Sequence, residues 1–228
     1  MNCKLIVQEN NTTGQVSADI ITMRIQLYLY FKKIVPELAL MTSTNRDLLL
    51  PSNTRGLKPP IFFDMDAEVY ITDILEIESY LDKIPPNLTD SQTFEDVAPN
   101  IYSRFLVYAV KPTESILKSI EKEICAVETQ LKKSGGPFLG GSEPCRADCI
   151  LFPKLFHIER FFFFTGIEDI ISSDKYPNVY QYYQMIYNLP NTEHIKSDRN
   201  SLVEFFKMKG VNPKKISNEM FMNIDILK

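Results

Sequence analysis

The sequence predicts an α+β protein in which a mixed four-stranded sheet with flanking helices precedes a purely helical part. Two observations lead to this prediction. In residues 1–84, segments of strand length and one clearly helical segment follow one another as β-α-β and then β-β-α. After residue 92 the strand signals cease and helical periodicities follow. We therefore expect domains at residues 1–84 and 93–228, joined by a linker at 85–92.

The composition is that of a packed globular protein. Of the 228 residues, 44% are hydrophobic and 24% are charged, so apolar burial can offset the entropy of ordering the backbone. The formal net charge is -4. A nucleic-acid surface requires clustered Lys and Arg, so we expect no nucleic-acid partner.

Cysteine usage and hydropathy suggest a compartment. The four cysteines have no CxxC spacing and no signal segment opens the chain, which favours a reducing, cytoplasmic location. Residues 20–40 form the longest apolar stretch, but charges and Pro36 interrupt it. Because each charge is costly at a bilayer centre, this stretch does not predict an ordinary transmembrane helix.

The first part of the chain has the element order of a thioredoxin-like domain. A strand at 3–8 precedes a helix from residue 20, whose apolar positions cover most of its circumference and predict burial. A second strand is expected at 38–42, and residues 43–58 give only a weak helical signal. Two prolines lead into an apolar strand at 61–63, and residues 68–71 are its hairpin partner. Thr72 or Asp73 then caps a helix that ends before Pro85.

The second part shows helical patterns alone. Helices are predicted at about 93–110, 112–133, from residue 145 onward, 178–188 and 197–209. The helix from residue 145 carries Asp148 and an interior Pro153, and interior proline costs about 3 kcal/mol. We expect both residues to have structural roles.

Several motifs resemble the chloride intracellular channel family. Residues 136–158 read GPFLGGSEPCRADCILFPKLFHI and resemble the family's glycine-rich loop, Ala-Asp-Cys and Pro-Lys-Leu segments. Residues 70–73 and 76–78 are similar to its Thr-Asp and Ile-Glu segments, and residues 176–187 to its aromatic-rich helix. The resemblance extends over residues 5–208 and implies an omega-like glutathione transferase fold.

The resemblance also implies a function. It predicts a monomer that associates with membrane lipids and takes part in chloride transport, in the cytoplasm with a membrane-associated pool. The family's membrane-inserting element corresponds here to Ala18 through Ser43. That segment carries Arg24, Lys32 and Lys33, which would have to pair, snorkel or line a pore.

The resemblance places Asp19 where redox-active members have a cysteine at the start of the first helix. A helix N-terminus lowers the pKa of a thiol, but it keeps an aspartate ionised, and that charge opposes a neighbouring thiolate. This substitution resembles nematode and other invertebrate members. We therefore expect no thiol catalysis and no enzyme activity, although a plain first-turn helix charge is the simpler interpretation of Asp19.

Further residues correspond to a vestigial glutathione site. By resemblance, Pro60 follows a cis peptide bond, and Thr72 and Asp73 hold a γ-glutamyl group at a helix N-terminus. The alternative is that Pro60 only opens a strand and that Thr72 and Asp73 are only caps. We expect no required cofactor, with glutathione as the ligand to test.

Cys145 and Cys149 lie one helical turn apart, which allows a metal-ligand or a core interpretation, and the lack of neighbouring ligands favours the core. No metal site is predicted, and His157 is expected in the core. Two alternative functions stay open: a glutathione-dependent transferase or oxidoreductase using Ser17 or Thr22, and a scaffold that binds membranes or cytoskeleton without conducting.

Overall fold

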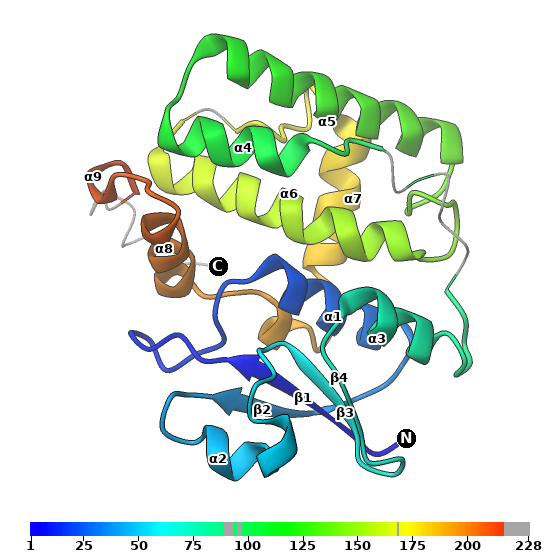
Figure 1. Cartoon of the computed structure of the whole chain (residues 1–228). Helices are drawn as coiled ribbons and strands as arrows, with labels where there is room; N and C mark the ends of the chain where they lie inside the picture. Colours follow the sequence, from blue (N-terminus) through cyan, green and yellow to red (C-terminus); the bar gives the residue numbers. More distant parts are fainter. Residues whose placement is uncertain (89–93, 95–96, 168, 217–228) are drawn as a thin grey trace. The chain divides into compact units, whose positions relative to one another are not determined.

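The computed structural model describes residues 1–88, 94, 97–167 and 169–216 (Figure 1). The chain divides into two compact units. The first comprises residues 1–88 and 191–202, and the second comprises residues 89–190 and 203–228. Residues 89–92 of the predicted linker, and residue 93 at the expected helix start, lie outside the described residues.

The first unit contains a four-stranded mixed sheet, as predicted. The strand order is β2-β1-β3-β4. β1 pairs with β2 in parallel and with β3 antiparallel, and β3 pairs antiparallel with β4. The strands are β1 (Cys3–Gln8), β2 (Glu37–Met41), β3 (Ile61–Asp64) and β4 (Val69–Ile71).

Two helices of the first unit lie beside each other, α1 (Ile20–Phe31) and α3 (Ile74–Leu81) (Figure 1). α1 is buried over most of its length, as its broad apolar surface predicts. The weakly signalled region holds α2 (Arg46–Leu49) and the 3-10 turn η1 (Ser52–Thr54). Neither has a buried residue, which explains why their sequences carry no periodic pattern.

The segment 191–202 differs from the predicted domain boundaries, because it clusters with the first unit. Its 3-10 turn η2 (Glu193–Ile195) packs against α1. Near its end, the Ser201 and Thr13 hydroxyls are 3.0 Å apart and hydrogen-bonded. These contacts join positions far apart in the sequence, so the helical pattern of this region gives no sign of them.

The second unit is helical within its described residues. α6 carries the interior proline Pro153, which is buried. Phe161 packs edge to face against Phe105 and Phe206, with ring centroids 5.4 and 5.3 Å away. The main helices are α4 (Ile101–Val110), α5 (Glu114–Ser134), α6 (Arg146–Thr165) and α7 (Pro177–Tyr187), followed by α8 (Arg199–Met208), which has residues in both units, and α9 (Pro213–Ile216).

Glu128 of α5 caps the start of α7. The Glu128 carboxylate accepts hydrogen bonds from the backbone N–H groups of Asn178 (3.2 Å) and Val179 (2.9 Å). These N–H groups lie in the first turn of α7 and have no backbone acceptor within the helix. Glu128→Ala is expected to lower the free energy of unfolding by about 1–2 kcal/mol, the usual cost of losing a helix cap. Urea unfolding measures this. Lys118→Ala, which breaks an exposed ion pair on the same helix, is the control and should change stability by less than about 0.5 kcal/mol.

His157 lies fully buried in α6, which confirms the predicted core placement. Its Nδ1 is 2.9 Å from the Tyr102 hydroxyl, and its Nε2 has no hydrogen-bond partner in the part of the chain that the structure describes. Phe205 and Phe206 pack against the ring. Burial lowers the pKa of His157 to about 3.

This buried imidazole predicts sensitivity to acid. In the unfolded chain a histidine has a pKa of about 6.5, so below that pH the unfolded state binds a proton that the native state does not. Stability should therefore fall as the pH drops from about 6.5 towards 3, by about 2 kcal/mol at pH 5 from this group. Urea unfolding at pH 7 and pH 5 measures the loss. His157→Gln should reduce the difference, whereas the exposed His194→Gln should leave it unchanged, and equal pH dependence in both variants would contradict the assignment.

Candidate functional site

Three polar contacts join α1 and the residue after it, Lys32, to α3 and the residues that follow it, 82–84. Arg24 forms a bidentate ion pair with Glu78, with Nε–Oε1 and Nη2–Oε2 distances of 2.6 and 2.7 Å. One turn further along both helices, the Tyr28 hydroxyl donates to Asp82, and beyond it Lys32 Nζ donates to the Ile84 carbonyl; these three contacts are called the α1–α3 ladder below. Because the partners advance together, the two helices are parallel.

The register of the ladder brings the two helix N-termini level with each other. Arg24 and Glu78 are 54 residues apart in sequence, and so are Tyr28 and Asp82. The first residues of the helices, Ile20 and Ile74, have the same separation. The first turns of α1 and α3 therefore lie side by side at one end of the first unit.

The sheet register brings Pro60 to this end as well. Ile61, which opens β3, pairs with Ile6 near the end of β1, and Ile71, which closes β4, pairs with Phe62 beside it. The chain leaves β1 towards Asp19 and leaves β4 towards Asp73. Asp19, Pro60, Thr72 and Asp73 thus gather at one end of the sheet, as their predicted shared site requires. The Pro59–Pro60 peptide bond is cis, which confirms the expected cis bond before Pro60.

Asp19 is the N-cap of α1. Its Oδ2 accepts hydrogen bonds from the Thr22 backbone N–H (2.9 Å) and the Thr22 hydroxyl (3.0 Å). An N-cap of this kind stabilises a helix by about 1 kcal/mol. The simpler interpretation of Asp19, as a charge at the start of the helix, therefore accounts for these contacts. Oδ1 makes no hydrogen bond with the residues that the structure describes. Because the Thr22 hydroxyl is buried and bound to Asp19, it is poorly placed to act as a nucleophile.

Asp73 is the N-cap of α3, and its Oδ1 accepts from the backbone N–H groups of Leu75 (2.9 Å) and Glu76 (3.0 Å). Asp73 is exposed and Thr72 half-buried. Within the described residues, Oδ2 of Asp73 has no hydrogen-bond donor. The cap role therefore leaves one carboxylate oxygen open to a ligand.

Within the first unit, the Cys3 thiol lies away from this site. Cys3 pairs with Asp64 at the opposite end of β1, about 16 Å from Gln8 at the usual rise of a strand. It is buried, and that burial, followed by the charge of Asp64, raises its pKa. Cys145 and Cys149 are buried in the second unit, and burial raises the pKa of Cys145 to about 12. Among the described residues, no group of three or more His, Cys, Asp or Glu could hold a metal ion.

Asp148 forms backbone hydrogen bonds at the start of α6 and to the loop before it. Its Oδ2 accepts from the Cys145 backbone N–H (2.8 Å) and its Oδ1 from the Leu139 backbone N–H (3.0 Å). Asp148 is fully buried, and this burial raises its pKa. Its structural role, predicted from the sequence, is thus visible as two backbone contacts.

The predicted membrane-inserting segment is held in the folded first unit. Ala18 is fully buried, and Lys32 is only 1% exposed. Lys33 is exposed with a left-handed φ of 57°, and Ser43 is exposed after β2. None of the described helices has the length and hydropathy needed to span a bilayer.

Comparisons with known proteins agree with this architecture. Residues 111–190 match the family described as glutathione S-transferase, C-terminal domain. A rice protein named probable glutathione S-transferase DHAR1, cytosolic, is 31% identical over 143 residues, covering 60% of this chain and 66% of the rice protein, just under two thirds of its length. An Arabidopsis thaliana protein named probable glutathione S-transferase DHAR4 is 26% identical over 79% of this chain and 85% of its own.

Solved structures show the same fold at low identity. The Chlamydomonas reinhardtii dehydroascorbate reductase has a TM-score of 0.75 and 18% identity, covering 92% of this chain and 99% of its own. The Caenorhabditis elegans chloride intracellular channel homologue EXC-4 has a TM-score of 0.74 and 17% identity, covering 96% and 84%.

This protein has the glutathione transferase fold, with a thioredoxin-like sheet unit and a helical unit. The curated relatives carry transferase names, whereas the channel family is represented by a structural likeness that shows the fold alone. The comparisons therefore favour the glutathione-dependent alternative over the chloride-channel interpretation.

Proposed function

We propose that this protein binds glutathione, or a related γ-glutamyl thiol, at the common end of α1 and α3, and that it does so without a catalytic protein thiol. The observation that carries the proposal is the level register of the two helix N-termini beside the start of β3. Helix N-termini favour anions because their first N–H groups are unsatisfied and the helix dipole is positive there.

The α3 end suits the γ-glutamyl part of the ligand. That part is a zwitterion with a carboxylate and an ammonium group. The Asp73 cap takes up the N–H groups of Leu75 and Glu76, so the N–H of Ile74 and the positive end of the α3 dipole remain to favour the carboxylate, and the open Oδ2 of Asp73 is an acceptor for the ammonium. Thr72 adds a hydroxyl next to them. Asp73 can serve as cap and ligand contact at once, because the two roles use different oxygens.

The α1 end suits a neutral thiol. Oδ1 of Asp19 can accept a hydrogen bond from an S–H group, whereas the negative charge of the carboxylate opposes ionisation of that thiol. Nucleophilic thiol chemistry requires the thiolate. We therefore infer binding without activation. Ser17 remains as a hydroxyl that could take part in a transferase reaction, and Ser17→Ala tests it: loss of conjugation of glutathione to an electrophile would overturn the non-enzymatic assignment.

Calorimetric titration with glutathione tests the binding. Asp73→Asn preserves a good N-cap but removes the charge, so affinity should fall at least tenfold with little change in stability. Asp47→Asn removes an exposed acid elsewhere in the first unit and should bind like the wild type. Absence of binding by the wild-type protein at millimolar glutathione, or equal affinity in Asp73→Asn, would contradict the proposal.

A second candidate function is membrane association with chloride transport, in a protein that is otherwise a cytoplasmic monomer. It is favoured by the resemblance of residues 136–158 to the chloride intracellular channel family. Liposome flotation and anion efflux, measured on one sample, distinguish the possibilities. Efflux supports transport, binding without efflux supports a membrane scaffold, and absence of both removes this candidate.

A further inference from the structure

A segment from late in the chain contacts the first unit on both sides of Asp19. Residues 191–202, called the brace below, cluster with the sheet although they follow α7 in sequence. The 3-10 turn η2 of the brace packs against α1, the helix that Asp19 caps. Ser201, near the end of the brace, reaches the loop between β1 and α1. One segment thus contacts both the loop before Asp19 and the helix after it.

The loop between β1 and α1 is a small hairpin with Thr13 in the turn at its tip. An antiparallel bridge joins its two arms. The Ser17 N–H donates to the Gln8 carbonyl at 2.9 Å, so the return arm lies against the end of β1. The Asp19 N–H donates in turn to the Ser17 carbonyl at 2.8 Å. Short backbone contacts therefore connect the tip of the hairpin to Asp19.

Hydrogen bonds run in one direction from this turn to the start of α8. The Ser201 hydroxyl donates to Asp198 Oδ2 at 2.5 Å, and a carboxylate has no hydrogen to give in return. Because the hydrogen of Ser201 is used there, the Thr13 hydroxyl is the donor in its 3.0 Å contact with Ser201. Thr13 Oγ1 accepts in turn from the Gln15 N–H at 3.3 Å. Each hydroxyl donates once and accepts once, in a chain that ends on a charged acceptor, and hydrogen bonds arranged in this way strengthen one another.

The α8 end of this hydrogen-bond chain is the better anchored. Asp198 Oδ1 accepts from the backbone N–H groups of Asn200 (2.8 Å) and Ser201 (3.1 Å), as an N-cap does. Ser201 is fully buried. The turn around Thr13 is mainly exposed. The start of α8 is therefore the anchor, and the turn is the part that it holds in place.

From these contacts we propose that the brace positions the α1 end of the proposed glutathione site, with Ser201 and Thr13 as positioning residues. The ligand part of this proposal rests on the proposed function, whereas the support of the loop rests on the hydrogen-bond chain alone. Ser201 acts through Thr13 and the loop, and η2 acts through α1. The α3 end is formed by its own cap, Asp73, so the two ends should respond differently when the chain is broken.

Amide hydrogen exchange of the ligand-free protein tests the support of the loop. Thr13→Val keeps the shape of the side chain but removes its donor, so the Ser17 and Asp19 N–H groups should exchange about two- to tenfold faster, the factor expected for loss of one hydrogen bond. Thr13→Ser keeps the hydroxyl and should exchange like the wild type. The Ile77 N–H, bonded to the Asp73 carbonyl in α3, is the internal reference and should not change. Wild-type exchange at Ser17 and Asp19 in folded Thr13→Val would overturn the proposal.

Titrations with glutathione, followed by calorimetry and ¹H–¹⁵N correlation, test the effect on the site. Thr13→Val and Ser201→Ala should each lower the affinity at least about threefold. At saturation the shift of the Ile20 N–H should shrink while that of Ile74 persists, and Thr13→Ser should retain wild-type affinity. Faster exchange without loss of affinity would overturn the positioning role. Absence of binding by the wild type contradicts the proposed function instead, and the exchange result then decides whether the brace holds the loop.

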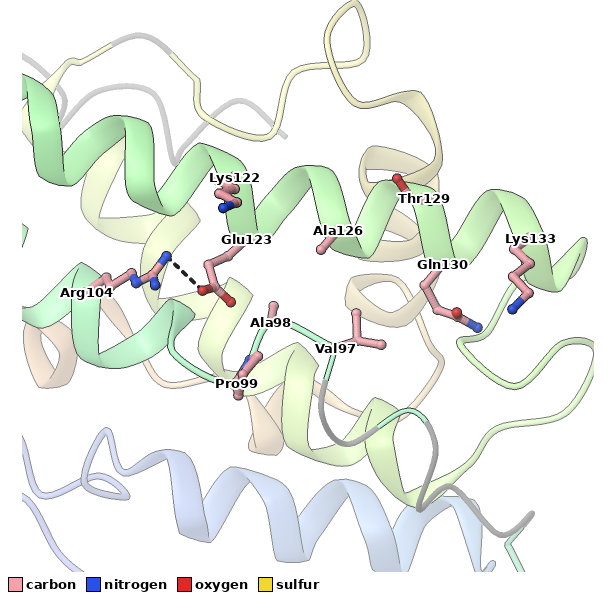
Figure 2. Close-up of a pocket in the computed structure, with 10 residues that line it drawn as sticks. All are labelled: Val97, Ala98, Pro99, Arg104, Lys122, Glu123, Ala126, Thr129, Gln130 and Lys133. Atoms are coloured by element: carbon pink, nitrogen blue, oxygen red, sulfur yellow. Dashed lines mark ion pairs between the residues drawn. The ribbon is translucent and has the colours of Figure 1, made fainter.

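A buried ion pair in the second unit provides the control for loss of stability alone. Glu123 is 8% exposed and pairs with Arg104 Nη1 at 2.8 Å, as Figure 2 shows. Glu123→Gln removes the charge that Arg104 pairs with, so it should lower the thermal unfolding temperature. Glutathione affinity and exchange at Ser17 should stay at their wild-type values. Equal losses of affinity in Glu123→Gln and Thr13→Val would attribute the effect to stability and overturn the positioning role.

Discussion

Asp19→Cys is expected to create a reactive thiol at the N-terminus of α1. The new thiol would occupy an N-cap position, where the first-turn N–H groups and the helix dipole stabilise a thiolate and lower the thiol pKa below about 8.5. Alkylation by iodoacetamide at pH 7 should therefore be at least about tenfold faster for the introduced thiol than for Cys125, the exposed native cysteine in the middle of α5.

The site of alkylation is identified by mass spectrometry. Ser43→Cys provides an exposed thiol in the same unit, outside any helix N-terminus, and should react at the ordinary rate. If glutathione binds as proposed, Asp19→Cys should also form a mixed disulfide with oxidised glutathione faster than Ser43→Cys does. An introduced thiol that reacts no faster than Cys125 would show that the start of α1 is not an activating environment.

Breaking the Arg24–Glu78 pair should cost about 3–5 kcal/mol of folding stability, the largest effect expected for a single substitution here. The side chain of Glu78 is 1% exposed and that of Arg24 is 14% exposed. Removing Arg24 leaves a buried carboxylate without its partner, which is far more costly than loss of the pair's own attraction. Urea unfolding of Arg24→Ala measures the effect.

Two comparisons make this test specific. Arg55→Ala breaks an exposed pair with Asp47 and should change stability by less than about 1 kcal/mol. The double substitution Arg24→Met with Glu78→Met should recover much of the loss, because it removes both charges together. A double variant as unstable as Arg24→Ala would contradict the assignment of the cost to the loss of Arg24 beside the buried Glu78 carboxylate.

The α1–α3 ladder also bears on membrane association. Release of α1 from the first unit would require separation of the Arg24–Glu78 pair and exposure of Lys32, which is held on the Ile84 carbonyl. Conditions that weaken the ladder are therefore expected to precede any insertion of this segment, and Arg24→Ala should increase vesicle binding if insertion occurs.

Much of the fold could be predicted from periodicity and caps. The broad apolar surface of the segment from residue 20 predicts a buried helix, and Asp73 before an apolar helical pattern predicts an N-cap. Both depend on neighbours within one or two turns. α2 escaped prediction because it spans four residues without a buried side chain.

The candidate site could be predicted only in part, because its geometry depends on contacts between distant segments. The family resemblance assigned Asp19, Pro60 and Asp73 to one site. The sequence did not identify Glu78 as the partner of Arg24. A sequence signal exists: residues with polar ends recur every four positions, at 24, 28 and 32, along and just after a mainly apolar helix. It becomes informative only when α1 and α3 are known to be parallel.

A ¹H–¹⁵N correlation titration of the full chain with reduced glutathione tests the central claim most directly. The account predicts saturable shifts confined to the backbone N–H groups at the common end of α1 and α3, chiefly Ile20, Ile61 and Ile74. Saturable shifts elsewhere that leave these three resonances in place, or no shifts at millimolar glutathione, would contradict it.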